Sequence, residues 1–143
     1  MGLTTGPQEI IGDKTFRGKA TFSKSATFKK GFTVENTKWH EVGASGEPAF
    51  ENSWANYSAA YNSAAYMKDS LGFVHLKGLV KDGTIGQAVF TLPAGYRPAN
   101  TVLQSTVSNS AAGASYIYAT GAVNAQIGNN AWFSLEGITF YAG

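Results

Sequence analysis

Residues 15–34 alternate between polar and apolar side chains, and a Thr-Phe pair recurs within them every six residues. The pairs are Thr15-Phe16, Thr21-Phe22 and Thr27-Phe28. None of the odd positions carries an apolar side chain, whereas most of the even positions are apolar or small. Because successive side chains of an extended strand point to opposite faces, this period of two predicts β-structure.

This stretch of 20 residues is too long for one straight strand. At about 3.3 Å per residue it would extend for roughly 66 Å, whereas a strand usually has about five or six residues. We therefore expect the chain to bend at Gly18, near Lys24 and at Gly31.

A ribbon with one large apolar side chain in every six residues cannot bury its phenylalanines alone. Further repeats in the same chain normally supply the missing neighbours, but three repeats are too few. The pattern favours a shaft of three chains wound about a threefold axis. The side chains expected at this axis are Phe16, Phe22, Phe28 and Phe32. The alternative is a pair of ordinary short strands in a monomeric sheet. We assign residues 1–38 to an N-terminal segment with this shaft, and residues 39–143 to a head domain.

The head has the composition and the turns of an all-β domain. Charged residues make up only 14% of the chain, and its 17 glycines disfavour a helical bundle. Strand-like segments alternate with turn-forming residues in the head; they are Pro48–Tyr57, Ala65–Lys68, Gly72–Lys81, Ile85–Leu92, Thr101–Ser108, Ser115–Val123 and Ala131–Tyr141. These segments predict an antiparallel β-sandwich or jelly-roll-like head, or a small barrel, preceded by the short extended β shaft.

The last of these segments breaks its own alternation. Phe133 and Leu135 share one face, but Ile138 and Phe140 continue that face only if one extra residue is inserted between the two pairs. We therefore expect a β-bulge at Glu136-Gly137.

Several classes of function are disfavoured by what the sequence lacks. There is no cysteine, and His40 and His75 lie far apart without the spacing of a zinc site, so we expect no metal and no cofactor. No apolar run approaches the about 20 residues of a membrane span, and no signal peptide is recognisable. We expect a protein that is made in a cytoplasm and does not insert into membranes.

The positive charge is concentrated in the first part of the chain. Residues 1–38 carry seven of the eleven basic residues against three acidic ones. Such a stretch could bind nucleic acid, but no RNA-binding motif with aromatic residues accompanies it. A solvated face is the favoured interpretation, and we expect no nucleic-acid partner.

No catalytic motif is recognisable. The chain has no nucleophile elbow, no P-loop and no dinucleotide-binding glycine pattern. Its head carboxylates lie in turns or alternate with apolar residues, without the pairing that glycoside hydrolysis requires. They are Glu41, Glu47, Glu51, Asp69, Asp82 and Glu136. We interpret them as solvated surface groups and expect no enzymatic activity.

Aromatic residues suggest a saccharide site. Trp54, Tyr57, Tyr61 and Tyr66 are interleaved with asparagine and serine, and Trp132 follows Asn129 and Asn130. Flat aromatic faces with short amides are typical of saccharide sites, although burial in the core or in an interface is the common alternative for each. His75 lies on the face opposite Val74 and Leu76 and has the same two interpretations. The candidate saccharide-binding residues are Trp54, Asn56, Tyr57, Tyr61, His75, Asn129 and Trp132.

Three stretches of the head resemble the C-terminal head of phage tail-fibre and receptor-binding proteins, particularly those of phages with Gram-positive hosts. They are AAYMKDSLGFVHLKGLVKDG, VFTLPAGYRPAN and GAVNAQIGNNAWFSLEGITFYAG, and AFENSWANY is similar to the family's first head strand. The resemblance covers about residues 39–143, and the three patterns occur in the expected order. Pro93 and Pro98 would make LPAGYRP a rigid connection, and Asp69 could accept backbone N–H bonds before Gly72.

The resemblance implies a homotrimeric head on a slender shaft, located at the phage tail tip in the virion. It implies adhesion, without catalysis, to host cell-surface saccharide such as teichoic acid or wall polysaccharide. The family usually has a long N-terminal region for attachment, so either this chain belongs to a longer fibre or residues 1–14 dock to other phage tail or baseplate proteins. Two alternatives remain open: a structural fibre or baseplate component whose head only caps the trimer or binds another phage protein, and a glycan-cleaving tail enzyme.

Overall fold

The computed structural model describes residues 6, 9–34 and 37–143, and it divides into two compact units. The first unit is Met1–Thr33 and the second is Val34–Gly143. Among the described residues there is no helix, and all the strands belong to the second unit. The prediction that residues 1–14 dock to another protein lies partly outside the described residues.

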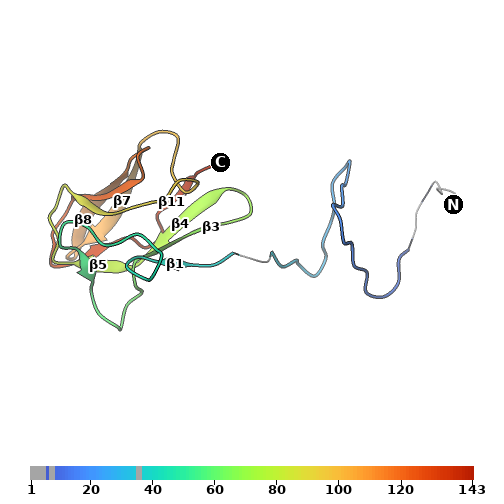
Figure 1. Cartoon of the computed structure of the whole chain (residues 1–143), viewed down its shortest axis with the longest axis horizontal. Coiled ribbons are helices and arrows are strands. Elements are labelled where there is room, and N and C mark those ends of the chain that lie inside the picture. Colours follow the sequence, from blue (N-terminus) through green and yellow to red (C-terminus); the bar gives the residue numbers. More distant parts are fainter. Residues whose placement is uncertain (1–5, 7–8, 35–36) are drawn as a thin grey trace. The chain divides into compact units, whose positions relative to one another are not determined.

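The second unit contains two antiparallel sheets (Figure 1). A four-stranded sheet has the order β1-β3-β4-β11. Its strands are β1 (His40–Glu41), β3 (Ala65–Lys68), β4 (Phe73–Lys77) and β11 (Thr139–Tyr141). The hairpin of β3 and β4 forms its middle, where Tyr66 pairs with Leu76.

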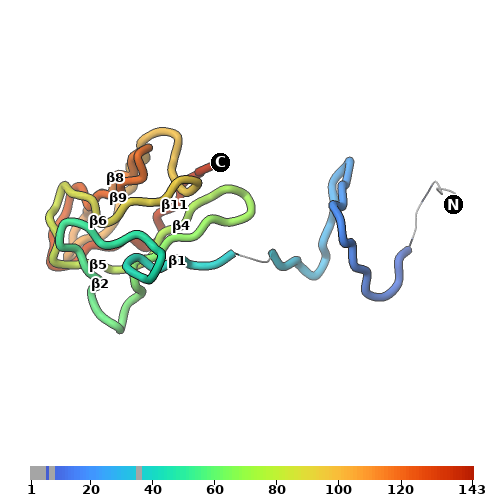
Figure 2. Tube along the Cα trace, viewed as in Figure 1, coloured from blue at the N-terminus to red at the C-terminus, as the bar shows by residue number. Residues whose placement is uncertain are grey.

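A seven-stranded sheet has the order β2-β5-β10-β7-β8-β9-β6. Its strands are β2 (Ala55–Asn56), β5 (Leu79–Lys81), β6 (Ala88–Thr91), β7 (Val102–Ser108), β8 (Ala111–Ile117), β9 (Ala122–Ile127) and β10 (Phe133–Ser134). Figure 2 shows β8, β9 and β6 side by side, as their antiparallel pairing requires.

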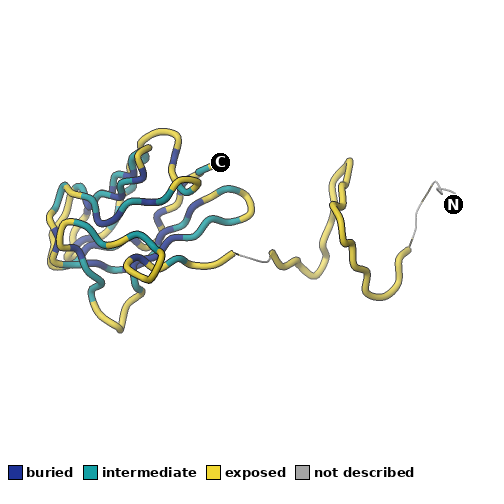
Figure 3. The backbone as a smooth tube through the Cα atoms, in the orientation of Figure 1, coloured by how far each residue is buried: buried dark blue, intermediate teal, exposed yellow. Residues whose placement is uncertain are grey.

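The two sheets share one apolar core. Tyr66 and Leu76 of the four-stranded sheet belong to the same buried cluster as Phe90, Ile117 and Phe133 of the seven-stranded sheet. In Figure 3 the buried segments lie along the strands of this unit, and the loops are largely exposed. The prediction of an all-β antiparallel sandwich is confirmed.

The chain passes from one sheet to the other four times, between β1 and β2, β2 and β3, β4 and β5, and β10 and β11. The last two of these crossings take only a few residues each, and neither is a bulge. Gly78 lies between β4 and β5, with a φ of 119°. Between β10 and β11, Glu136-Gly137 form a turn in which Gly137 has a φ of 78°. The expected bulge at Glu136-Gly137 is therefore wrong. The alternation breaks there because the chain turns and enters the other sheet.

Backbone hydrogen bonds join these two crossings. The N–H of Leu135 donates to the carbonyl oxygen of Gly78 at 2.8 Å, and the N–H of Leu76 donates to that of Ile138 at 2.8 Å. The two chain segments are thus paired on both sides of their crossings: β4 pairs with β11 in one sheet, and β5 pairs with β10 in the other. Such paired crossings hold the corner of the sandwich.

Some predicted strand boundaries are wrong. The segment Ser115–Val123 is divided between β8 and β9, because the chain turns ahead of Gly121, whose φ is 94°. The connection between the predicted segments Thr101–Ser108 and Ser115–Val123 is shorter than expected: only Asn109 and Ser110, both with positive φ, separate β7 from β8. A two-residue turn of this kind matches the twist of a hairpin. Of Pro48–Tyr57, only β2 is strand.

The first unit, described by itself, is exposed at every described position of residues 9–33 (Figure 3). Bends lie at Arg17-Gly18 and Ser23-Lys24, and a turn lies at Lys29-Lys30 with Gly31 at a φ of 88°. These positions match the expected bends. No strand forms among the described residues of this unit. The predicted shaft depends on pairing with other copies of the chain, so it stays a prediction.

Replacing Gly78 by alanine should cost about 2–4 kcal/mol of unfolding free energy. A Cβ at this position would lie 2.5 Å from the Cα of Ala64, and the φ of 119° is itself unfavourable for alanine. Gly137→Ala is the matched control, because that glycine also has a positive φ but has no atom within 4 Å of an added Cβ. Gly137→Ala should cost only about 1 kcal/mol. Urea titration of the native chain and of both variants measures these losses. Equal losses for the two variants would contradict the close contact at Gly78.

Candidate functional site

A cleft of about 520 Å³ opens beside the crossings between the sheets. The segment after β2 lines it with Tyr57, Ala60, Tyr61 and Asn62. Leu79 of β5 and Val107 of β7 add apolar surface. Trp132, Ser134 and Glu136 complete it from the segment around β10. The cleft therefore depends on the order of β5, β10 and β7 in the larger sheet.

Two tyrosines present rings at nearly a right angle. The ring centroids of Tyr57 and Tyr61 are 5.4 Å apart, with an interplanar angle of 75°. The N–H of Tyr57 donates to the carbonyl oxygen of Leu79, and that of Tyr61 donates to Ser58, so backbone bonds hold both residues. Tyr61 is 56% exposed, which leaves its ring accessible to a ligand.

Trp132 reaches the cleft from a loop that Ser108 holds in place. The hydroxyl of this buried serine lies 2.9 Å from the carbonyl oxygens of both Asn129 and Trp132, and it accepts the N–H of Asn129 at 2.8 Å. The side chain of Asn130 also donates to the carbonyl oxygen of Gly83. These bonds fix the loop from both ends, so that the indole has a defined position beside β10.

Glu136 contributes the carboxylate of the cleft. Its Oε1 accepts the Asn62 amide at 2.7 Å and the Gly78 N–H at 3.1 Å. Glu136 lies at the surface, as expected, but these bonds give it a structural role that the sequence did not indicate. Its side chain is exposed, yet it joins its own crossing between the sheets to the one at Gly78 and to the segment that carries the tyrosines.

Three of the seven predicted saccharide-binding residues come together in this cleft. Tyr57, Tyr61 and Trp132 line it, although Trp132 is far from the tyrosines in the sequence. The sequence indicated Asn62 only as one of several asparagines that are interleaved with the aromatic residues. Nothing in the sequence signalled that Leu79, Val107, Ser134 and Glu136 line the same cleft, because their approach depends on strand order.

The other four predicted residues lie outside the lining of the cleft. Trp54 is only 3% exposed and belongs to the core, with its ring against Gly83 and 6.2 Å from that of Phe133. The Asn56 side chain accepts the N–H of Ala64. Asn129 is exposed, and its side chain accepts the N–H of Ala131 within the loop that carries Trp132. These asparagines shape the segments on which the cleft residues are placed.

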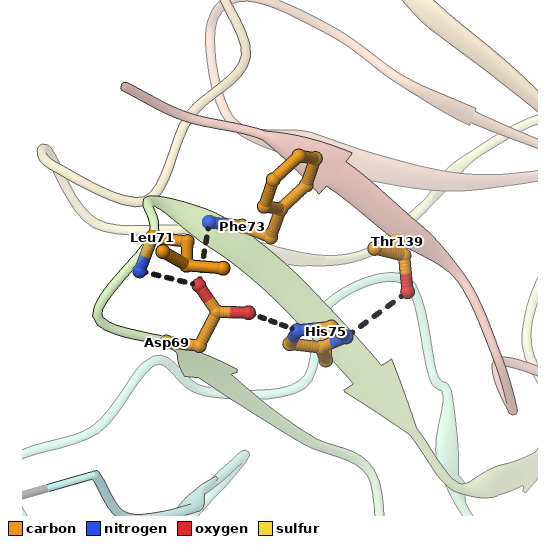
Figure 4. Close-up of polar contacts among 5 residues, drawn as sticks. All are labelled: Asp69, Leu71, Phe73, His75 and Thr139. Atoms are coloured by element: carbon orange, nitrogen blue, oxygen red, sulfur yellow. Dashed lines mark hydrogen bonds and ion pairs between the residues drawn. The ribbon is translucent and has the colours of Figure 1, made fainter. Parts of the chain in front are cut away.

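His75 belongs to a separate polar cluster on the four-stranded sheet (Figure 4). Asp69 Oδ1 accepts the N–H groups of Leu71 at 2.9 Å and Phe73 at 3.0 Å. Its Oδ2 lies 2.8 Å from His75 Nε2, and His75 Nδ1 lies 3.1 Å from Thr139 Oγ1. The expectation that Asp69 accepts backbone N–H bonds before Gly72 is confirmed. The hydrogen bond to His75, with help from the two backbone donors, lowers the pKa of the Asp69 carboxyl.

This carboxylate–imidazole–hydroxyl chain has the order of a hydrolytic triad. His75 and Thr139, however, are cross-strand partners on β4 and β11, and Asp69 uses its other oxygen to cap the hairpin turn. None of the three lines the cleft. The cluster is best explained as the polar link between β3, β4 and β11.

A second polar network surrounds β1. The Tyr66 hydroxyl donates to Glu47 Oε2 at 2.6 Å, and His40 Nδ1 lies 2.7 Å from Glu47 Oε1. The His40 ring stacks on that of Tyr66, with centroids 5.0 Å apart. Burial and the bond to Glu47 raise the pKa of Tyr66, whereas the bonds from Tyr66 and His40 lower that of Glu47. The network ties β1 to the hairpin of β3 and β4.

The described residues contain no group of three or more His, Cys, Asp or Glu side chains placed to hold a metal ion. Nor does any helix in the described part of the chain have the length and apolar character that crossing a membrane requires. Comparison of the chain with protein-family models, with curated proteins and with solved structures gave no match. The resemblance to phage receptor-binding heads therefore rests on the sequence motifs alone.

Asp69 should make the stability of the head sensitive to acid. Its folded-state pKa is lowered, so its contribution is complete above the ordinary value of about 4 and is lost as the pH falls through the lower folded value. In urea titrations between about pH 5 and pH 3, Asp69→Asn should lose less unfolding free energy than the native chain loses. Asp82→Asn, at a side chain 67% exposed, is the control and should follow the native profile. Parallel profiles for Asp69→Asn and the native chain would contradict this role.

Proposed function

We propose that this protein is a non-catalytic adhesin whose cleft binds host cell-surface saccharide. The observation that carries the proposal is the convergence of Tyr57, Tyr61 and Trp132 on one cleft of about 520 Å³. Sugar rings stack their C–H faces on such aromatic groups. The amide of Asn62 and the hydroxyl of Ser134 also line the cleft, where they can form hydrogen bonds with the hydroxyl groups of a sugar.

The groups in the lining support a site without catalytic activity. Hydrolysis of a glycosidic bond ordinarily uses two carboxyl groups on opposite sides of that bond. Among the residues that line the cleft, Glu136 supplies a carboxylate, and its Oε1 is engaged by Asn62 and Gly78. Such a site is suited to hold a saccharide and lacks the second acid that cleavage would need.

The motifs of the head support a more specific proposal. The protein would be the shaft and head of a phage tail-fibre or receptor-binding protein, and its ligand teichoic acid or wall polysaccharide. The chain would form a homotrimer at the phage tail tip, with its N-terminal segment joined to other tail or baseplate proteins. Three weak sites on each trimer, multiplied by several fibres, would supply the avidity that adhesion needs.

The exposed phenylalanines of the first unit support the trimer. Phe16, Phe22, Phe28 and Phe32 are between 59% and 73% exposed. Phe28 and Phe32 contact each other, with ring centroids 5.5 Å apart, but this pair leaves most of both rings in water. A trimer axis would remove these four side chains from water.

Trp132→Ala should reduce retention of the protein on purified cell-wall polysaccharide by about two- to tenfold, because one stacking face is lost. Tyr141→Ala is the control: this aromatic residue is 59% exposed and does not line the cleft. It should leave retention unchanged in the same pull-down. If the native protein is retained by no wall polysaccharide and by no sugar of a glycan array, the adhesin proposal fails. A structural fibre or baseplate component would then be favoured.

Phe22→Asp should abolish trimerisation, since three carboxylates would meet near the axis without partners. Thr21→Asp places the same charge on the opposite face of the segment and should leave the trimer intact. Sedimentation equilibrium at micromolar concentration distinguishes the two results. A native chain that sediments as a stable monomer, or a Phe22→Asp variant that remains trimeric, would contradict the axial position of Phe22.

A further inference from the structure

We infer that the cleft selects saccharide units bearing a free ammonium group over neutral or N-acetylated ones. This inference rests on the proposed saccharide-binding function and names the chemical class of its ligand. It depends on two features of the cleft, the angle between its aromatic rings and the orientation of its carboxylate.

The aromatic side chains form a corner suited to a cation. The rings of Tyr57 and Tyr61 meet at 75°, with centroids 5.4 Å apart, and Trp132 lines the same cleft. The faces of aromatic rings carry negative partial charge, so a cation surrounded by two or three of them is attracted by each. Lys81 Nζ lies 5.9 Å from the Tyr57 centroid, so a ligand ammonium would contact the corner on the side of Tyr61 and Trp132.

The carboxylate of the cleft is oriented by its own hydrogen bonds. In the described part of the chain, the bonds to Glu136 from Asn62 and Gly78 both go to Oε1, which leaves Oε2 for a ligand. An ammonium group can donate to this oxygen while its carbon neighbours lie against an aromatic ring. A neutral acetamido group brings no charge to the site and gains much less from the carboxylate.

The charges around the cleft favour the same class of ligand. Glu136 is an ionisable carboxylate in the lining, whereas Lys81 does not line the cleft and lies 3.8 Å from the Asp82 carboxylate. Leu79 and Val107 give one side of the site an apolar surface. A phosphate or carboxylate in the cleft would meet the charge of Glu136 without a cation in the lining to offset it.

The test compares two oligosaccharides that differ only at nitrogen. Isothermal titration at about pH 6, below the ordinary pKa of an amine, would use the hexamer of β-1,4-linked glucosamine and its fully N-acetylated counterpart. The glucosamine hexamer should bind about tenfold more tightly. Glu136→Gln should remove this preference, because it deletes the charge and keeps an oxygen for Asn62 and Gly78. Glu41→Gln, at an exposed position on β1 of the other sheet, has the same change of net charge and should keep the preference.

Each outcome decides the inference. Equal binding of the two hexamers, or a preference that survives in Glu136→Gln, would overturn it and leave the proposed saccharide-binding function standing. A preference lost equally in Glu41→Gln would assign it to long-range charge and would also overturn the inference. Binding of neither hexamer overturns it as well, and the wall pull-down with Trp132→Ala then decides separately whether the proposed function fails.

Discussion

The backbone at Gly78 is the point on which the rest of the head depends. There the chain leaves the four-stranded sheet for the seven-stranded one, packed so closely against Ala64 that a Cβ would lie 2.5 Å from its Cα. The crossing at Glu136-Gly137 is bonded to the one at Gly78 through the N–H of Leu135 and the carboxylate of Glu136. One buried core fills the space between the two sheets. If this junction opened, the two sheets would lose both their register and their common core.

The candidate site is a consequence of this junction. Leu79 directly follows the crossing at Gly78, and Glu136 lies in the crossing between β10 and β11. The Glu136 carboxylate accepts a hydrogen bond from Asn62, which lies in the same segment as Tyr57 and Tyr61. A single carboxylate thus maintains the fold and gives the cleft its charge. A substitution that removes the charge and preserves the junction must therefore retain the hydrogen-bonded oxygen, as glutamine does.

The sequence predicted the class of the fold and part of the site, and the missing part has physical causes. Alternation and turn residues identified strands near β3, β4, β6 and β7, because those signals are local. β9 was missed because the turn before Gly121 is built from small residues that also suit a strand. Tyr57 and Tyr61 were found from their polar neighbours, but the same pattern could not separate buried Trp54 from half-buried Tyr57 and exposed Tyr61. The bonds of Glu136 were not predicted because its partners, Asn62 and Gly78, approach it only through strand order.

The central claim, that the aromatic cleft binds saccharide, can be tested with the three tryptophans of the chain. Each gives its own indole N–H signal in a two-dimensional ¹H–¹⁵N spectrum. Trp132 lines the cleft, Trp54 is buried in the core, and Trp39 lies against Lys77 on the other sheet. During titration with fragments of host wall polysaccharide, the account predicts that the Trp132 signal shifts with saturation while the Trp54 and Trp39 signals stay in place. A saturating shift of Trp39 with an unmoved Trp132 would contradict it.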